Sequence, residues 1–293
     1  VGSGPAGCSA ALYAARAGQE VVVISMGMGA LSKAELIQNY YGFEEGITGA
    51  ELYRQGVAGA KAVGAEFITV VGLDYTGSLV VQTTEGDYPA DAVILATGAG
   101  RIAPKIAGLA EHEGRGVSYC ATCDGMLYRG REVAIVGGGN TAVGDALTLA
   151  RLAGRVTLIH RRDALRASAV YLDKLRENGV NIVWNTEVKA LQGDDRLTGL
   201  VLRNKVTGEE STLPVDGLFV AVGRRPETAL FRGQLETDEA GYLIADETTR
   251  TSLPGVYAVG DVRRKPVRQI LTAAADGAVA AHYIEEYLAG NRA

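Results

Sequence analysis

At 293 residues the chain is longer than a single hydrophobic core usually holds, so its length predicts two domains. A net charge of −5 lacks the basic surface that would favour nucleic acid or an anionic membrane as a partner. The apolar runs fall well short of the ~20 residues that a membrane span needs. With no signal peptide visible and two of three cysteines in one Cys-x-x-Cys pair, we expect a reducing, cytoplasmic location.

The first glycine motif opens the chain. Gly2, Gly4 and Gly7 form a Gly-x-Gly-x-x-Gly pattern that runs into an Ala-rich helix, and a parallel strand, EVVVI, follows and ends next to Ser25. Gly2 permits a tight turn, Gly4 lets a pyrophosphate approach the backbone, and Gly7 allows close packing of helix on strand. The strand that normally precedes this turn is missing from the sequence, and we expect residues upstream of Val1 to supply it.

The next stretch predicts a helix and several strands. Thr48–Gly64 has the pattern of an amphipathic helix, and Glu66–Val71 and Leu79–Thr84 alternate like hairpin strands around a turn at Tyr75–Ser78. The apolar strand Ala92–Gly98 ends in Thr-Gly. The polar and basic residues that follow, up to Gly116, indicate a domain boundary.

A Cys-x-x-Cys pair then stands at Cys120 and Cys123, with Asp124 directly after it. The spacing lets two sulfurs meet across one helical turn, where a helix N-terminus lowers a thiol pKa. Half a zinc site is an alternative, but neither the histidines nor Cys8 has matching spacing. A second alternative for the cysteines is a pair of small core residues. The alternative for Asp124 is an acid that only stands at the start of a helix. We interpret the pair as a redox dithiol, Asp124 as its proton donor, and Cys8 as a buried apolar side chain.

A second copy of the strand, glycine turn and helix follows. Gly137, Gly139 and Ala142 repeat the motif, and Gly137 to His160 spans 23 residues, as does Gly2 to Ser25. Equal spacing predicts two nucleotide-binding domains of similar architecture. Three more segments resemble hairpin strands and a further one mirrors the strand ending in Thr-Gly; they are Asn181–Leu191, Leu197–Lys205, Glu210–Leu213 and Gly217–Gly223.

Arginines stand where a domain that binds NAD places an acid. Arg161 and Arg162 follow His160 at the tip of the second strand, and Arg166 lies one helical turn on. Guanidinium groups bind a 2′-phosphate through charge-assisted hydrogen bonds, which favours NADPH. A solvated basic face is the alternative.

The tail carries two strand patterns within Tyr242–Ala258 and a closing helix at Ala273–Leu288. It has no glycine fingerprint of its own, so we expect it to complete an earlier domain. The whole predicts an α/β protein of two Rossmann-like, three-layer nucleotide-binding domains, the second inserted in the first. The boundaries predicted are residues 1–107 with 224–293 for one domain and 108–223 for the other.

The ordered set of motifs is similar to that of a known family. CATCDG, GGGNTA, HRRxxxR, the ATG strand end and GVYAVGD followed by Arg268 and Gln269 resemble the low-molecular-weight, flavin-dependent thioredoxin reductases. The resemblance implies a homodimeric protein in which NADPH reduces FAD, FAD reduces the Cys120–Cys123 disulfide, and the dithiol reduces thioredoxin or a thioredoxin-like protein. Cys123 is then the sulfur nearer the flavin.

The resemblance also implies the site residues, and it includes no metal. FAD is assigned to Gly2, Ser3, Gly4, Pro5, Ala6, Gly7, Asn39, Ala96, Thr97, Gly98, Gly260, Asp261, Arg268, Gln269 and Ile270. NADPH is assigned to Gly137, Gly138, Gly139, Asn140, Thr141, Ala142, His160, Arg161, Arg162 and Arg166. The chain departs from the family pattern at Ala30, which replaces a polar residue, and at Gly144–Asp145, where two acids often follow GGGNTA.

Three other functions compete with this one. A flavin dithiol oxidase and a ferredoxin-fed reductase have the same build, but neither has a use for three arginines around a 2′-phosphate. A non-catalytic NADP(H)-sensing protein needs no dithiol. The sequence therefore favours the NADPH-dependent disulfide reductase.

Overall fold

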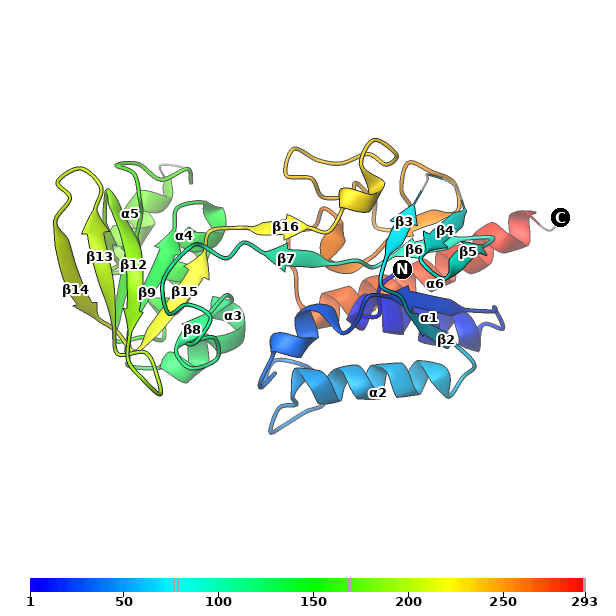
Figure 1. The fold of residues 1–293 in the computed structure, drawn as a ribbon, viewed down its shortest axis with the longest axis horizontal. Coiled ribbons are helices and arrows are strands. Elements are labelled where there is room, and N and C mark those ends of the chain that lie inside the picture. The colour runs from blue at the N-terminus through cyan, green and yellow to red at the C-terminus, as the bar shows by residue number, and fades with distance from the viewer. Residues whose placement is uncertain (76, 78, 168–169, 292–293) are drawn as a thin grey trace. The chain divides into compact units, whose positions relative to one another are not determined.

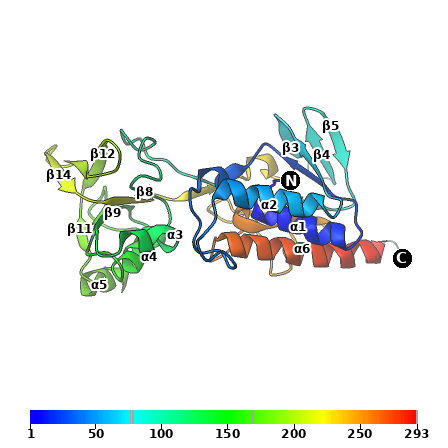
Figure 2. The ribbon, with the colours of Figure 1, turned by 90° about the horizontal axis from the view of Figure 1, so that it is seen from below.

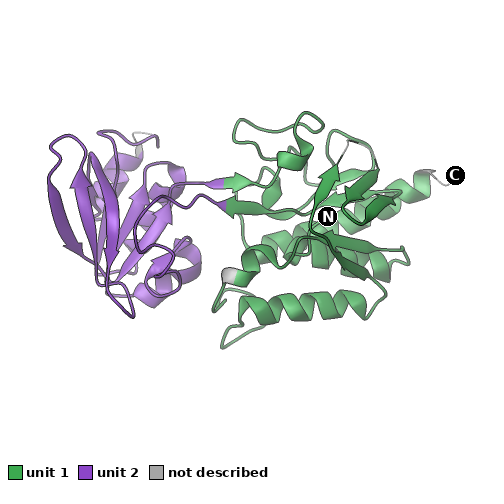
Figure 3. Ribbon diagram, viewed as in Figure 1, with its two compact units in different colours: residues 1–100, 225–293 green, residues 101–224 purple. Residues whose placement is uncertain are grey.

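The computed structural model describes residues 1–75, 77, 79–167 and 170–291. The chain divides into two compact units (Figure 3). Unit 1 comprises Val1–Gly100 and Arg225–Ala293, and unit 2 comprises Arg101–Arg224. Positions 76 and 78 of the predicted turn at Tyr75–Ser78 lie outside the described residues.

Unit 2 is built on a parallel sheet of five strands in the order β11-β10-β9-β15-β8. A separate antiparallel sheet has the order β12-β13-β14. The strands are β8 (Val117–Ser118), β9 (Glu132–Gly137), β10 (Arg155–Ile159), β11 (Asn181–Val183), β12 (Thr186–Gln192), β13 (Gly199–Asn204), β14 (Glu210–Pro214) and β15 (Gly217–Ala221). The helices are α3 (Ala121–Asp124), η2 (Gly125–Tyr128), α4 (Asn140–Leu149) and α5 (Val170–Glu177).

Alternation along the buried strands of unit 2 assigns side chains to two faces of the sheet. On β9, Val133 and Ile135 join the apolar cluster formed with α4 and α5, whereas Ala134 joins the cluster formed with the β12–β14 sheet. Phe219 and Leu218 divide in the same way on β15. Because successive side chains of a strand point to opposite faces, helices cover one face and the antiparallel sheet covers the other.

Unit 1 has the same plan. Its elements are α1 (Pro5–Arg16), β1 (Val22–Ser25), η1 (Gly29–Lys33), α2 (Gly49–Lys61), β2 (Glu66–Thr69), β3 (Leu73–Tyr75), β4 (Val80–Thr83), β5 (Gly86–Pro89), β6 (Val93–Leu95), η3 (Ala229–Phe231), β17 (Val256–Ala258), η4 (Gly260–Val262) and α6 (Ile270–Asn291). Parallel pairs β1-β2 and β6-β17 are joined through the first two residues, since the amide of Gly2 donates to the Ile24 carbonyl and the amide of Ala96 donates to the Val1 carbonyl. The β3-β4-β5 sheet is antiparallel.

Three helices lie side by side in unit 1, with α1 packed against both α2 and α6 (Figures 1 and 2). Pro5 at the first helical position starts α1, since its missing N–H is no loss there. Thr48 caps α2 by accepting a hydrogen bond from the amide of Glu51 at 3.2 Å. The glycine turn before α1 follows the residues that join β1 to β6.

Three predicted segments are corrected by the structure. Residues 66–69 form β2 in parallel with β1, so the hairpin's first strand is β3 and not Glu66–Val71. Asn181–Leu191 is not one strand, because Asn185 takes a positive φ of 52° and separates β11 from β12. Within Tyr242–Ala258 the structure has one strand, β17, and isolated bridges elsewhere.

Two short strands, β7 (Ala99–Arg101) and β16 (Arg224–Pro226), carry the chain between the units and pair with each other. Within the described ranges, none of the helices combines the length and the apolar composition that crossing a membrane requires.

Candidate active site

The dithiol pair lies at the start of α3, directly after β8. Cys120 and Cys123 form a disulfide with their Cα atoms 5.3 Å apart, and the Cys120 sulfur accepts a hydrogen bond from the Cys123 amide at 3.2 Å. Ala121, between them, is buried in the same cluster as Ala142 and Ala146 of α4. The disulfide is the oxidised form that a redox pair takes. Among the described residues, no group of three or more His, Cys, Asp and Glu side chains that could hold a metal ion occurs.

Asp124 is held beside the disulfide by a hydroxyl from the preceding strand. The hydroxyl of Ser118 donates to a carboxylate oxygen of Asp124 at 2.5 Å. Burial raises the pKa of Asp124, against the opposing effects of the Ser118 hydrogen bond and the charge of Arg101. Arg101 itself pairs with Glu113 at 3.0 Å and lies over the ring of Tyr119. A carboxyl that gains protons more readily than usual fits a proton donor to a leaving thiolate.

A second acid, Asp145 of α4, lies next to α3. Burial raises the pKa of Asp145 to about 6, although the charge of Arg224 and a hydrogen bond from the Ala121 amide both act to lower it. Gly144, its neighbour, faces open space. The Gly144–Asp145 departure therefore leaves one acid, and that acid contacts the backbone between the two cysteines.

The unit-2 glycine turn is shaped for a close approach to the backbone. A Cβ on Gly137 would lie 2.5 Å from the Ala221 carbonyl oxygen, and one on Gly138 would lie 2.1 Å from the His160 ring. By contrast, a Cβ on Gly139 would meet nothing within 4 Å. The turn thus packs tightly on the protein side and is open at Gly139, where α4 begins with Asn140, Thr141 and the buried Ala142.

His160 is buried beneath this turn and supports it. One ring nitrogen is 2.7 Å from the Gly137 carbonyl oxygen and the other 2.9 Å from that of Ala164. The imidazole therefore ties the turn to the loop after β10. Arg161, Arg162 and Arg166 lie exposed on that loop, and the amide of Arg166 donates to the Gly138 carbonyl at 2.8 Å.

The unit-1 glycine turn has the same character. Gly2 has a φ of 102°, and a Cβ there would lie 2.4 Å from the Ala96 carbonyl oxygen. A Cβ on Gly7 would lie 1.9 Å from the Gly2 carbonyl oxygen, whereas Gly4 has nothing within 4 Å. The first amides of α1 have no partner within the helix, so the open side at Gly4 suits an anion such as a pyrophosphate.

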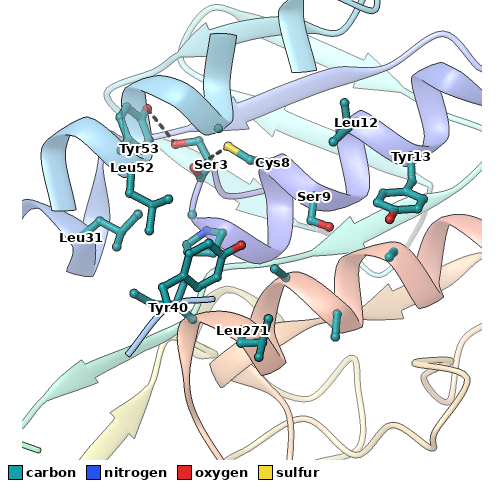
Figure 4. Close-up of a pocket in the computed structure, with 17 residues that line it drawn as sticks. Ser3, Cys8, Ser9, Leu12, Tyr13, Leu31, Tyr40, Leu52, Tyr53 and Leu271 are labelled. Atoms are coloured by element: carbon teal, nitrogen blue, oxygen red, sulfur yellow. Dashed lines mark hydrogen bonds between the residues drawn. The ribbon is translucent and has the colours of Figure 1, made fainter. Parts of the chain in front are cut away.

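A cavity of about 360 Å³ opens beside this turn, between α1, α2 and α6 (Figure 4). The buried Ser3 hydroxyl lies 3.1 Å from the Tyr53 hydroxyl and 3.2 Å from the Gly27 carbonyl oxygen. Its side chain is thus used within the protein. Cys8 is buried and its thiol donates to the Ser3 carbonyl; burial raises the pKa of Cys8 to about 11, as an inert thiol requires.

The structure brings other predicted residues of unit 1 together across long separations. The Asn39 amide donates to the Gln269 side-chain oxygen at 3.0 Å. The Thr97 hydroxyl donates to the Glu227 carbonyl at 2.8 Å, and the Glu227 amide donates to the Gly98 carbonyl. Arg268 stacks on the Tyr242 ring, 3.9 Å from its centroid.

The remaining predicted residues lie in the same part of unit 1. Pro5 and Ala6 open α1, Gly260 and Asp261 form η4, and Ile270 starts α6. Ser118, Arg101 and Asp276 were not predicted from the sequence, because each acts through a partner that folding brings near. The available signal was an acid at position 276 among the small and apolar residues of the first half of α6.

A sequence profile of the pyridine nucleotide-disulphide oxidoreductases matches residues 1–277, and the chain belongs to this family. Its curated relatives are named more narrowly. Thioredoxin reductase of Streptomyces coelicolor is 44% identical over 99% of this chain and 92% of its own length. That of Listeria monocytogenes is 41% identical over 98% of this chain and 92% of its own length.

Solved structures show the same similarity. The crystal structure of thioredoxin reductase from Streptococcus pyogenes has a TM-score of 0.92 at 38% identity, covering 99% of this chain and 96% of that one. These comparisons confirm the resemblance drawn from the motifs and the α/β class of Rossmann-type nucleotide-binding domains.

Proposed function

We propose that this chain reduces the disulfide of thioredoxin, or of a thioredoxin-like protein, with electrons from NADPH that pass through FAD. The observation that carries the proposal is the Cys120–Cys123 disulfide at the start of α3, with Asp124 hydrogen-bonded beside it. The family and the named relatives support a flavin, NADPH and a thioredoxin substrate.

The residues of unit 1 fit a flavin dinucleotide. The tight Gly2–Gly7 turn would hold the pyrophosphate through backbone amides, because Gly4 leaves its outer side open. Residues 96–98, with the linked pair Asn39 and Gln269, would line the flavin. When bound, FAD supplies a two-electron carrier between the nicotinamide and the disulfide.

The residues of unit 2 fit NADPH. Amides at the start of α4 would hold its pyrophosphate, and the exposed Arg161, Arg162 and Arg166 would hold the 2′-phosphate. We accordingly propose that residues 1–107 and 224–293 form the FAD-binding domain and residues 108–223 the NADPH-binding domain. The two compact units of the structure meet at Gly100/Arg101 and Arg224/Arg225 in the chain.

The net reaction takes NADPH, one proton and a disulfide to NADP⁺ and two thiols. One thiolate of the Cys120–Cys123 pair attacks the substrate's disulfide and forms a mixed disulfide, and the other then displaces the reduced substrate. Asp124 donates the proton to a departing thiolate, since burial raises its pKa and Ser118 fixes its orientation.

We also propose a homodimer in the cytoplasm. On α1 and α6, Tyr13 and Leu271 line the cavity and keep 53% and 51% of their surface exposed, which suits a partner surface. Cysteine usage supports the reducing compartment. The exposed arginines favour NADPH over ferredoxin as electron donor, and the dithiol favours an enzyme over an NADP(H) sensor.

The test is a Cys123→Ser variant of the flavin-loaded protein, assayed without oxygen. We expect NADPH to bleach the yellow flavin as in the unmodified protein, while reduction of thioredoxin is lost. Normal thioredoxin reduction by the variant would show that the cysteine pair is structural. In a second assay of the unmodified protein in air, oxygen-dependent NADPH consumption as fast as thioredoxin reduction would favour the dithiol oxidase instead.

A further inference from the structure

A buried charged cluster lies under η4, outside the residues that the sequence pointed to. Asp276 of α6 accepts hydrogen bonds from Arg263 Nε at 3.0 Å and Nη2 at 3.1 Å, and from Lys265 Nζ at 2.6 Å. The three side chains are 10%, 7% and 6% exposed, respectively. One carboxylate therefore holds two buried cations.

The same carboxylate fixes the backbone of the turn. The amide of Gly260 donates to Asp276 Oδ2 at 2.8 Å, and Gly260 has a positive φ of 74°. Lys265 also donates to the Thr272 carbonyl and Arg263 to the Asp246 carbonyl. Asp276 thus joins η4, the segment that leaves η4, and α6.

The cluster lies next to the first turn of α1. A Cβ on Gly260 would lie 3.0 Å from the Ala6 Cβ, and one on Gly277 would lie 2.3 Å from the Ala6 carbonyl oxygen. Gly277 is the neighbour of Asp276, so the carboxylate sits where η4, α6 and the glycine turn converge. A displacement of Asp276 would therefore shift both η4 and the glycine turn, the two segments of unit 1 that we propose to bind FAD.

The cluster also acts on the segment before α6. Arg268 Nη2 donates to the Arg263 carbonyl at 3.2 Å, and Arg268 Nε donates to the Asp261 carbonyl at 3.4 Å. Because Arg263 is clamped by Asp276, the position of Arg268 over the Tyr242 ring depends on the same carboxylate.

We propose that Asp276, with Arg263 and Lys265, is a positioning residue for FAD: it locks the segment from Gly260 to Arg268 against α6 and the first turn of α1 in the shape that binds the dinucleotide. Buried ion pairs add little stability compared with well-packed apolar residues. The Asp276 ion pairs are therefore explained by the position they give to the segment that binds the ligand. The inference rests on the proposed function, since it needs FAD to occupy unit 1.

The test uses the flavin-loaded protein and Asp276→Asn, which keeps the shape of the side chain and removes its charge. Dilution, with released flavin followed by fluorescence, measures the FAD dissociation constant, and circular dichroism at the same temperature measures the folded fraction. We expect the constant to rise about 10- to 100-fold, as for one lost charge-assisted hydrogen bond, in a protein that stays folded. Asp276→Glu should recover part of the affinity.

A matched control and a milder variant keep the outcome decisive. Glu286→Gln removes an exposed ion pair with Arg250 on the same helix and should leave FAD binding unchanged. Lys265→Met keeps the Asp276–Arg263 pair, so it tests the cluster if Asp276→Asn fails to fold, and it should weaken FAD binding several-fold. Equal FAD affinity in the folded variants and the unmodified protein would overturn the inference, whereas an unmodified protein that binds no FAD would overturn the proposed function.

Discussion

Replacing Asp145 with Asn should make the folded protein more stable at neutral pH. Asn keeps an oxygen that can accept the hydrogen bond from the Ala121 amide, but it removes a carboxylate that burial disfavours. Burial raises the pKa of Asp145 from 3.8 to about 6, and each pKa unit corresponds to about 1.36 kcal/mol, so the ionised group costs at most about 3 kcal/mol.

The pH dependence follows from proton binding. Between pH 3.8 and about 6 the folded protein holds a proton on Asp145 that the unfolded chain has lost, so the free energy of unfolding falls as pH rises through this window. Above about pH 6, the folded protein bears the full free-energy cost of the ionised Asp145 carboxylate. The advantage of Asp145→Asn should therefore be about half of its full size at pH 5 and reach its full size at pH 7 to 8.

Urea unfolding followed by circular dichroism at pH 5, 6, 7 and 8 measures this difference. Asp173→Asn on α5 is the matched control, because that carboxylate is 74% exposed and its loss should give no comparable trend. A stability difference between Asp145→Asn and the unmodified protein that is constant across this range, or that favours the unmodified protein at pH 8, would refute the reasoning.

Three further predictions concern the binding turns and the proton donor. Removing both guanidinium groups in Arg161→Ala/Arg162→Ala should raise the KM for NADPH about 10²-fold and leave that for NADH nearly unchanged; equal effects on the two coenzymes would contradict the 2′-phosphate contact. Gly4→Ala should weaken FAD binding with little change in unfolding temperature, since its Cβ meets nothing in the protein, whereas Gly7→Ala should lower that temperature sharply; calorimetry and flavin release separate the two. Asp124→Asn should slow thioredoxin reduction by about 10²- to 10⁴-fold while flavin bleaching by NADPH persists, and a normal steady-state rate would exclude Asp124 as the acid.

Local chemistry made the class of the protein predictable. A glycine turn is required in part by steric contacts over a few residues, as the clash of a Cβ on Gly7 with the Gly2 carbonyl shows, so it appears as a short motif. The Cys-x-x-Cys pair is equally local, because one helical turn brings its sulfurs together. Repetition of the turn at the same spacing then predicted two similar nucleotide-binding units.

Strand pairing was decided by tertiary structure. The segment at residues 66–69 alternates like a hairpin strand, yet it pairs with β1 across α2. Alternation of apolar and polar residues indicates only that the two faces of a strand have different surroundings. Which neighbouring strand it pairs with depends on the apolar surfaces that the whole unit buries.

The sequence by itself determined the glycine turns, the dithiol and the arginines after β10, since each depends on residues close together in the chain. The tertiary structure alone decided which groups lie buried together. Asp276 meets Arg263 and Gly260 across 13 and 16 residues, and Asn39 meets Gln269 across 230. Asp145 acquires its raised pKa because folding removes it from water. Desolvation and long-range contact are properties of the folded core, and no local pattern encodes them.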